Sequence, residues 1–151
     1  MSIKDLVTLA KQHGLNSLGL SERHVLYSAL EFQLECDKQG IKPIFGLEIT
    51  MFDQDVQFDS QLIAKNSKGY ECLIECSYLL HQGHSVTWST LEPYEEDIIF
   101  IVYTENGPFE SFFLKRQTQA IDDYLLKIKN TLPNVYLGVS HQESRYLKKN
   151  N

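Results

Sequence analysis

Apolar residues near the start of the chain recur at helical spacing. One set falls on a single face of an N-terminal helix: Ile3, Leu6, Val7 and Ala10. Ser2 with Asp5 forms a capping pair at the start of this helix. The apolar run at 17–20 then predicts a short buried strand. A second helical stripe follows and ends at Gly40, a residue typical of helix C-caps; its members are Leu26, Ala29, Leu30 and Phe32.

Four further apolar runs predict strands, at 42–52, 58–65, 97–103 and 135–140. The first is nearly continuous, as expected for a strand covered on both faces. Three helices are predicted between these strands. Ser67 caps one over 69–81, Ser89 with Glu92 opens a short one, and a long one has its apolar face at Ile121, Leu125, Ile128 and Leu132. This alternation predicts an α/β fold with about five mostly parallel strands.

Composition narrows the class of protein. The chain has 151 residues, of which 42% are hydrophobic and 23% charged, as is typical of one globular domain. Its apolar runs are too short to cross a bilayer, and its first residues read as an amphipathic helix, so we expect no membrane association and a cytoplasmic location. The net charge is −6 with no basic stripe, which argues against a strong direct nucleic-acid surface.

The cysteines and histidines give only weak metal signals. Cys72 and Cys76 lie one turn apart on a predicted helix, a spacing that can offer two thiolates to a metal ion. No second Cys or His pair stands at the spacing of a structural zinc site, and a glycine separates His81 from His84. We therefore expect Cys72, Cys76 and the remaining Cys36 to be buried thiols.

One polar stretch lies between a predicted strand and a predicted helix, a position where α/β enzymes commonly have catalytic residues. Ser21, Glu22, Arg23 and His24 follow the 17–20 strand and precede the second helix. The pattern predicts a strand-to-helix turn, which is an active site, the remnant of one, or an ordinary first helical turn. In the last case Glu22 would suit the positive end of the helix dipole.

Two blocks of the sequence together resemble a known family. They read IKDLVTLAKQHGLNSLGLSERHVLYSALEFQLECDKQGIKPIFGLEI (3–49) and LIAKNSKGYECLIECS (62–77). In order and spacing they are similar to the PHP (polymerase and histidinol phosphatase) domain of bacterial DNA polymerase III alpha subunits, and GIKPIFGLE is the most specific piece. The similarity is strongest over 3–77 and looser over 78–140. We interpret 1–151 as a single partial PHP domain.

The resemblance implies a PHP-type βα barrel, a distorted TIM-like fold with metal ligands at the strand ends. A closed eight-stranded βα barrel needs on the order of 250 residues, so the length predicts an incomplete barrel. In metal-binding members the ligands include an early His-x-His, an Asp-His pair, a Glu, and later His and Asp residues. Such clusters hydrolyse phosphoesters. In some polymerases this gives a proofreading 3′–5′ exonuclease, whereas in others the site has decayed.

The first block departs from this ligand pattern. The family's Thr-Asp-His falls on Ser21, Glu22 and Arg23. An arginine presents only donors and a permanent positive charge, which repels a divalent ion. His24 stands one residue late, and the His-x-His strand would lie before Met1.

Two later positions complete the comparison with the family. Glu48 matches the family's Glu, Asp59 falls where a His is expected, and the remaining ligands would lie beyond Asn151. The resemblance therefore implies a vestigial site with no catalytic residue and no metal ion, formed by Glu22, Arg23, Glu48 and Asp59. Glu22 and Glu48 are weak candidates for a single ion, and we predict an Arg23–Glu48 salt bridge in the former metal position.

Three functions follow as hypotheses. The favoured one is part of a bacterial DNA polymerase III alpha subunit (a DNA-directed DNA polymerase and nucleotidyltransferase of DNA replication). Its PHP portion would be structural or a docking surface, without a cofactor, in contact with the rest of the subunit and with replisome proteins. The second is a metal-dependent phosphoesterase or 3′–5′ exonuclease of the PHP superfamily, and the third a free-standing interaction module. Because an opened barrel leaves unpaired strands, we also expect the fragment to self-associate.

Overall fold

The computed structural model describes residues 1–53, 56–105 and 107–139. Its secondary structure confirms the predicted alternation of helices and strands. In chain order the elements are α1 (Ile3–Gln12), β1 (Ser17–Arg23), α2 (Ala29–Gln39), β2 (Lys42–Asp53), β3 (Val56–Ala64), α3 (Ser67–His81), α4 (Trp88–Leu91), a 3-10 turn η1 (Glu92–Tyr94), β4 (Ile98–Tyr103), α5 (Pro108–Leu114), α6 (Thr118–Thr131) and β5 (Val135–Gly138).

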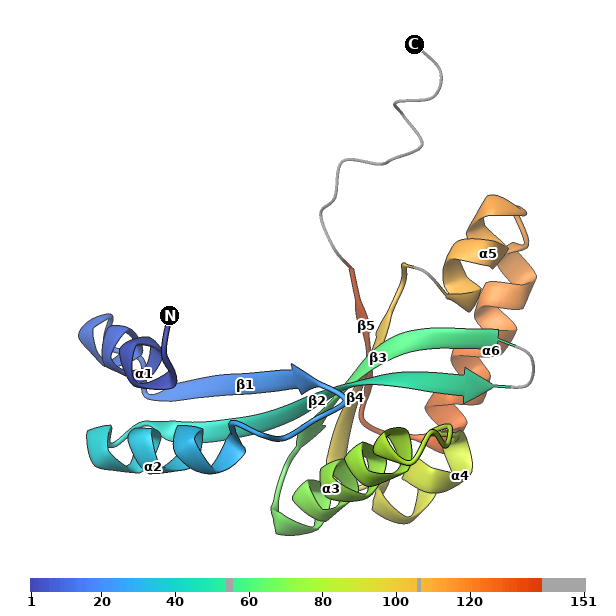
Figure 1. Cartoon of the computed structure of the whole chain (residues 1–151). Coiled ribbons are helices and arrows are strands. Elements are labelled where there is room, and N and C mark those ends of the chain that lie inside the picture. The colour runs from blue at the N-terminus through green and yellow to red at the C-terminus, as the bar shows by residue number, and fades with distance from the viewer. Residues whose placement is uncertain (54–55, 106, 140–151) are drawn as a thin grey trace.

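The five strands form one sheet in the order β1-β2-β3-β4-β5 (Figure 1). The outer pairs, β1–β2 and β4–β5, are parallel, whereas β3 pairs antiparallel with both of its neighbours. Only residues 54–55 separate β2 from β3, and a parallel connection needs a dozen or more residues. Four strands therefore run in one direction, which confirms the mostly parallel sheet. Over the described residues the sheet is not closed, so the incomplete barrel stays a prediction.

All six helices pack on the same face of this sheet. Each contributes at least one buried side chain to the two clusters of the core: Val7, Phe32, Leu73, Leu91, Phe109 and Ile128. The strands meet these helices with every second residue, among them Leu47, Ile49 and Leu62. We call the other side the open face, since none of the described helices packs on it. The expectation that β2 is covered on both faces is wrong, because Phe52 on the open face is 41% exposed.

Several local predictions are confirmed. Ser2 and Asp5 form the capping box of α1, and Gly40 ends α2 in the left-handed conformation. The apolar face of α6 packs on the core through the four predicted residues, of which Ile128 and Leu132 are fully buried. All three cysteines are buried free thiols.

Other boundaries differ from the predictions. β1 extends through Arg23 and α2 begins only at Ala29, so Ser21, Glu22 and Arg23 belong to a strand, and the polar stretch does not form the first turn of a helix. Asn66, not Ser67, caps α3, because its side chain accepts a hydrogen bond from the Gly69 N–H. Thr87 with Thr90, not Ser89 with Glu92, opens α4.

Two further predictions about helices also need correction. The long helical segment after β4 is two helices, α5 and α6. Leu30 is 69% exposed and lies outside the buried stripe of α2, which is formed by Ala29, Phe32 and Cys36.

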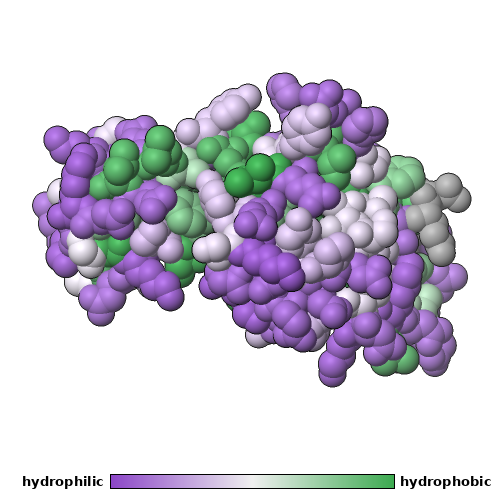
Figure 2. All heavy atoms as spheres, turned by 90° about the horizontal axis from the view of Figure 1, so that it is seen from below, coloured by the Kyte–Doolittle hydropathy of each residue, from purple (hydrophilic) through white to green (hydrophobic). Residues whose placement is uncertain are grey.

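The outer surface of the helices is largely polar. Figure 2 shows the molecule from the side on which α2 and α3 lie. Apolar surface gathers between the region of α2 and the region of α3. Exposed apolar side chains on the two helices include Leu30, Leu34 and Ile74. Within the described ranges, every helix is too short or too polar to cross a membrane.

Candidate functional site

The end of β1 divides the predicted site residues between the two faces of the sheet. Glu22 pairs with Leu47, which is buried beneath the helices, and Arg23 pairs with Glu48. Because neighbouring residues of a strand point to opposite faces, Arg23 and Glu48 lie on the open face and Glu22 does not. Asp59 of β3 pairs with Thr50, two residues beyond Glu48, and therefore also lies on the open face.

Glu22 has a structural partner on the helix-covered face. Its carboxylate accepts hydrogen bonds from the Ser28 backbone N–H and from the Ser28 hydroxyl, both at 2.9 Å. These bonds join the end of β1 to the start of α2. The structure therefore does not bring Glu22 and Glu48 together as ligands of one ion.

Arg23 makes a bidentate ion pair with Asp59 across β2. Its Nη1 and Nη2 donate to the two carboxylate oxygens of Asp59, each at 3.1 Å. Thr50, between them in the sheet, donates its hydroxyl to Asp59 Oδ1 at 2.9 Å. The predicted Arg23–Glu48 salt bridge is not formed; the guanidinium reaches diagonally to β3, where it finds the parallel pair of acceptors that its planar fork fits.

Both members of this ion pair are held in their charged forms. Burial alone would raise the pKa of Asp59, but the hydrogen bonds from Arg23 and Thr50 outweigh it and lower that pKa. The hydrogen bond to Asp59 raises the pKa of Arg23. The side chains are 53% and 36% exposed, so water screens the pair and its net contribution to stability is about 0–1 kcal/mol.

His24 adopts an unusual backbone conformation directly after β1. Its φ of 63° lies in the left-handed region, which a residue with a side chain seldom occupies. Its N–H donates to the Glu48 carbonyl at 2.9 Å, and its own carbonyl accepts from the Ser77 hydroxyl of α3 at 2.8 Å. The ring Nε2 lies 3.0 Å from the Thr50 hydroxyl. The conformation therefore turns the His24 ring back toward the ion pair.

The sequence reasoning missed two neighbours of the ion pair, Thr50 and Tyr103. Tyr103 ends β4 on the open face, where burial and then the charges of Glu48 and Asp59 raise the pKa of its phenol. Strand alternation could have identified Thr50, because it stands two residues after Glu48. The position of Tyr103 depends on the register between β3 and β4, which the sequence does not reveal.

The resulting donor set does not fit the metal cluster of the family. Both Asp59 oxygens already accept from Arg23, and Glu22 lies on the other face. The carboxylate of Glu48, in contrast, forms no hydrogen bond or ion pair with any described residue. No group of three His, Cys, Asp or Glu residues that could hold a metal ion occurs in the described part of the chain. A catalytic metal centre needs about three protein ligands with a position left open for water.

Comparison with known proteins assigns this chain to a family. A model of the PHP domain matches residues 1–142. DNA polymerase III subunit alpha of Halalkalibacterium halodurans is 36% identical over 110 residues, which are 70% of this chain and 10% of that protein. The subunit of Bacillus subtilis (strain 168) is 34% identical over 117 residues, 73% of this chain and 10% of that protein. The chain thus spans about a tenth of the length of these curated relatives.

A solved structure is similar at a lower level. An amidohydrolase from Chromobacterium violaceum covers 80% of this chain and 69% of its own length, with 8% identity and a TM-score of 0.48. The family assignment rests instead on the sequence matches, which extend over most of the chain. The chain belongs to the PHP domain family and is homologous to the PHP region of DNA polymerase III alpha subunits.

Proposed function

We propose that this chain is the PHP portion of a bacterial DNA polymerase III alpha subunit and that this portion is structural rather than catalytic. DNA-directed nucleotide transfer would belong to the rest of the subunit, in the cytoplasm, and the PHP portion would support it or dock other replisome proteins. The homology to PHP regions of alpha subunits supports the first part of the proposal.

The observation that carries the second part is the Arg23–Asp59 ion pair. It places a guanidinium on the open face beside Glu48, which matches a ligand position of metal-binding family members. The permanent positive charge of the Arg23 guanidinium repels a divalent cation. The guanidinium also donates hydrogen bonds to both carboxylate oxygens of Asp59, so these oxygens are not free to bind a metal. The remaining carboxylate, Glu48, cannot by itself hold an ion that activates water. The ion pair thus links β1 to β3 at the position where metal-binding family members have their ions.

An activity assay tests the catalytic half of the proposal. The purified chain is incubated with Mn²⁺ or Zn²⁺ and offered single-stranded DNA or a chromogenic phosphate ester. We expect no turnover above that of buffer with metal. Turnover that disappears in Glu48→Ala and persists in Gln61→Ala, which alters the neighbouring position on β3, would establish the metal-dependent phosphoesterase instead.

The size of the native gene product tests the other half. An antibody raised against this chain should detect, in a lysate of the source cells, a protein about ten times longer, as the curated relatives are. A stable native product of 17.5 kDa would contradict the polymerase assignment and favour a free-standing interaction module.

A further inference from the structure

An open groove lies on the helix-covered side of the sheet, between α3 and residues 25–27 of the connection from β1 to α2. Its volume is about 360 Å³, and we call it the α3 groove. Its lining residues on α3 include Tyr70, Ile74, Tyr78 and His81, which share one face of the helix over about three turns. Strands that extend the sheet at β1 or β5 in a longer subunit would lie in the plane of the sheet and not in this groove.

Hydrogen bonds hold the two walls of the α3 groove in place. The Ser77 hydroxyl of α3 donates at 2.8 Å to the carbonyl of His24, directly before residues 25–27. Directly after them, the backbone N–H and the hydroxyl of Ser28 both donate to the Glu22 carboxylate at 2.9 Å. A groove whose walls are already fixed loses little conformational entropy when it binds a partner.

The α3 groove exposes apolar side chains close to one another. Tyr27 is 81%, Tyr78 63% and Ile74 50% exposed, and Figure 2 shows apolar surface between the regions of α2 and α3. Contiguous apolar surface marks interaction sites, and tyrosine is one of the residues that contribute most to binding at protein interfaces. The groove therefore fits apolar side chains of a protein partner.

Carboxylates lie along the outer side of the α3 groove. Glu71 and Glu75 are exposed on α3, and each stands three residues before a groove residue, Ile74 and Tyr78 respectively. The Tyr94 hydroxyl donates a hydrogen bond to Glu75 at 2.8 Å and carries no charge that would offset it. None of the residues that line the groove is Lys or Arg. A partner with basic residues is complementary to this arrangement.

We propose that the α3 groove binds an amphipathic α-helix of a partner protein, with apolar residues on the contacting face and Lys or Arg beside them. The backbone groups of α3 are already hydrogen-bonded within the helix, so an extended peptide could not add to this wall by strand pairing. A helix satisfies its own backbone groups and presents side chains at i, i+4 and i+7 to such a groove. Its basic side chains would face Glu71 and Glu75.

This inference deepens the docking part of the proposed function and rests on it. Its test measures binding, and neither turnover nor the length of the gene product, so the inference and the proposed function can fail separately.

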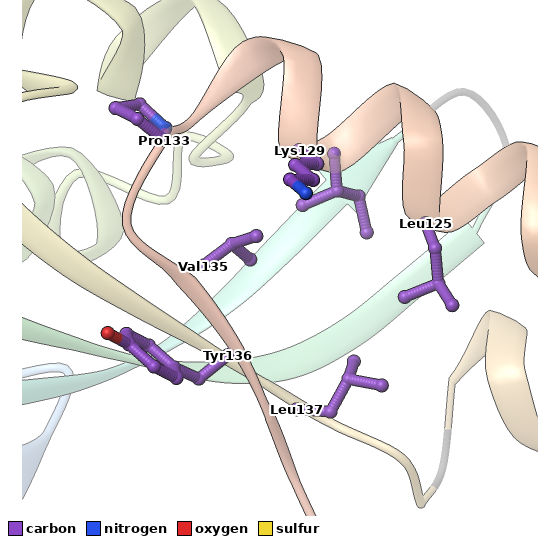
Figure 3. Close-up of a pocket in the computed structure, with 7 residues that line it drawn as sticks. Leu125, Lys129, Pro133, Val135, Tyr136 and Leu137 are labelled. Atoms are coloured by element: carbon purple, nitrogen blue, oxygen red, sulfur yellow. The ribbon is translucent and has the colours of Figure 1, made fainter.

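A second cavity, of about 330 Å³, lies between α6 and β5 and serves as a comparison. Figure 3 shows Leu125 and Leu137 pointing toward one another across it. Its charged lining residue is a cation, Lys129, so it would repel a basic helix. A probe that binds any apolar cavity would not distinguish the two sites, whereas the proposed helix should prefer the α3 groove.

Fluorescence anisotropy of a labelled synthetic peptide, titrated with the purified chain, tests the proposal. The probe is a peptide of about 18 residues, long enough to form a helix, with leucines on one face and Lys and Arg elsewhere. One control peptide has the same composition with its leucines scattered around the helix, and another has Glu in place of Lys and Arg. We expect saturable binding of the probe and at least about tenfold weaker binding of both controls.

Variants of the chain locate the binding site. Ile74→Lys should weaken binding of the probe at least about tenfold, because it places a cation in the α3 groove. Leu137→Lys is the matched control, since Leu137 is 43% exposed and lines the second cavity, and it should change binding by less than about twofold. Tyr78→Ala adds no charge and should also weaken binding, so it supplies the same test if Ile74→Lys fails to fold. Equal binding of the three peptides, unchanged binding in the groove variants, or equal loss in both lysine variants would overturn the proposal.

Discussion

Two ion pairs of this protein differ sharply in burial, and the difference predicts their contributions to stability. Asp53, at the end of β2, is 9% exposed and accepts hydrogen bonds from Lys127 of α6 at 2.7 and 2.9 Å. Tyr124 donates a further hydrogen bond to it at 3.1 Å. Asp59 in the Arg23 pair is 36% exposed and its partner 53%. Replacing each aspartate by alanine in turn compares the two pairs.

Asp53→Ala should cost about 2–3 kcal/mol, because it removes the acceptor of three hydrogen bonds and leaves the half-buried Tyr124 hydroxyl without its partner. Lys127 is 42% exposed and can return to water, which limits the loss. Asp59→Ala also removes the acceptor of three hydrogen bonds, but it should cost only about 0–1 kcal/mol, because the side chains of Asp59 and Arg23 are 36% and 53% exposed and water can replace these bonds. The first variant should therefore be less stable than the second by about 2 kcal/mol.

Urea unfolding at pH 7 measures both free energies, and equal slopes show that the denatured states are comparable. A pH series checks the cause. Burial alone would raise the pKa of Asp53, but the hydrogen bonds from Lys127 outweigh it and lower that pKa. Its contribution is therefore present above the unfolded pKa of about 3.9 and is lost as the pH falls below it. Equal costs for the two variants, or a difference that persists undiminished near pH 3, would refute this reasoning.

Three further predictions concern local structure. Gly69→Ala should destabilise the protein by about 2–3 kcal/mol or more, because a Cβ there would lie 2.1 Å from the Asp97 carbonyl oxygen. Gly19→Ala is the control: the nearest atom to its Cβ would be 3.9 Å away, so it should change stability by less than about 0.5 kcal/mol. Similar urea midpoints for the two variants would contradict this prediction. His24→Gly should be more stable than His24→Ala by about 1 kcal/mol, since the left-handed conformation at this position favours glycine, and thermal unfolding curves that coincide would argue against a retained positive φ. The native cysteines should resist a thiol reagent such as DTNB until the chain unfolds, because the hydrogen bond with Cys72 and burial raise the pKa of Cys76; rapid labelling of the folded protein would show the opposite.

The sequence predicted the elements well where periodicity was strong. The α6 stripe, the Ser2–Asp5 cap and the β-branched run of β4 each depend on local spacing, and the structure has all three. The end of β1 cannot be predicted in this way, because Ser-Glu-Arg resembles a polar turn. Those residues extend the strand since β2 continues beside them, and a partner strand is not visible in local sequence.

The composition of the site was predicted in part. The family resemblance identified Arg23, Glu48 and Asp59, and the structure brings these three together on the open face. It did not predict that Glu22 would lie on the helix-covered face, or that Arg23 would form its ion pair with Asp59 instead of Glu48. Both outcomes follow from strand register, which is set by tertiary pairing and becomes apparent only when the sheet is assembled.

The proposed structural role requires that Arg23 and its ion pair stand in place of a metal site. Calorimetric titration of Mn²⁺ or Zn²⁺ into the purified chain at neutral pH measures whether an ion binds there. We expect no saturable binding to the chain, and the same flat profile for Glu48→Ala. Stoichiometric binding by the wild-type chain that is lost in Glu48→Ala would contradict it.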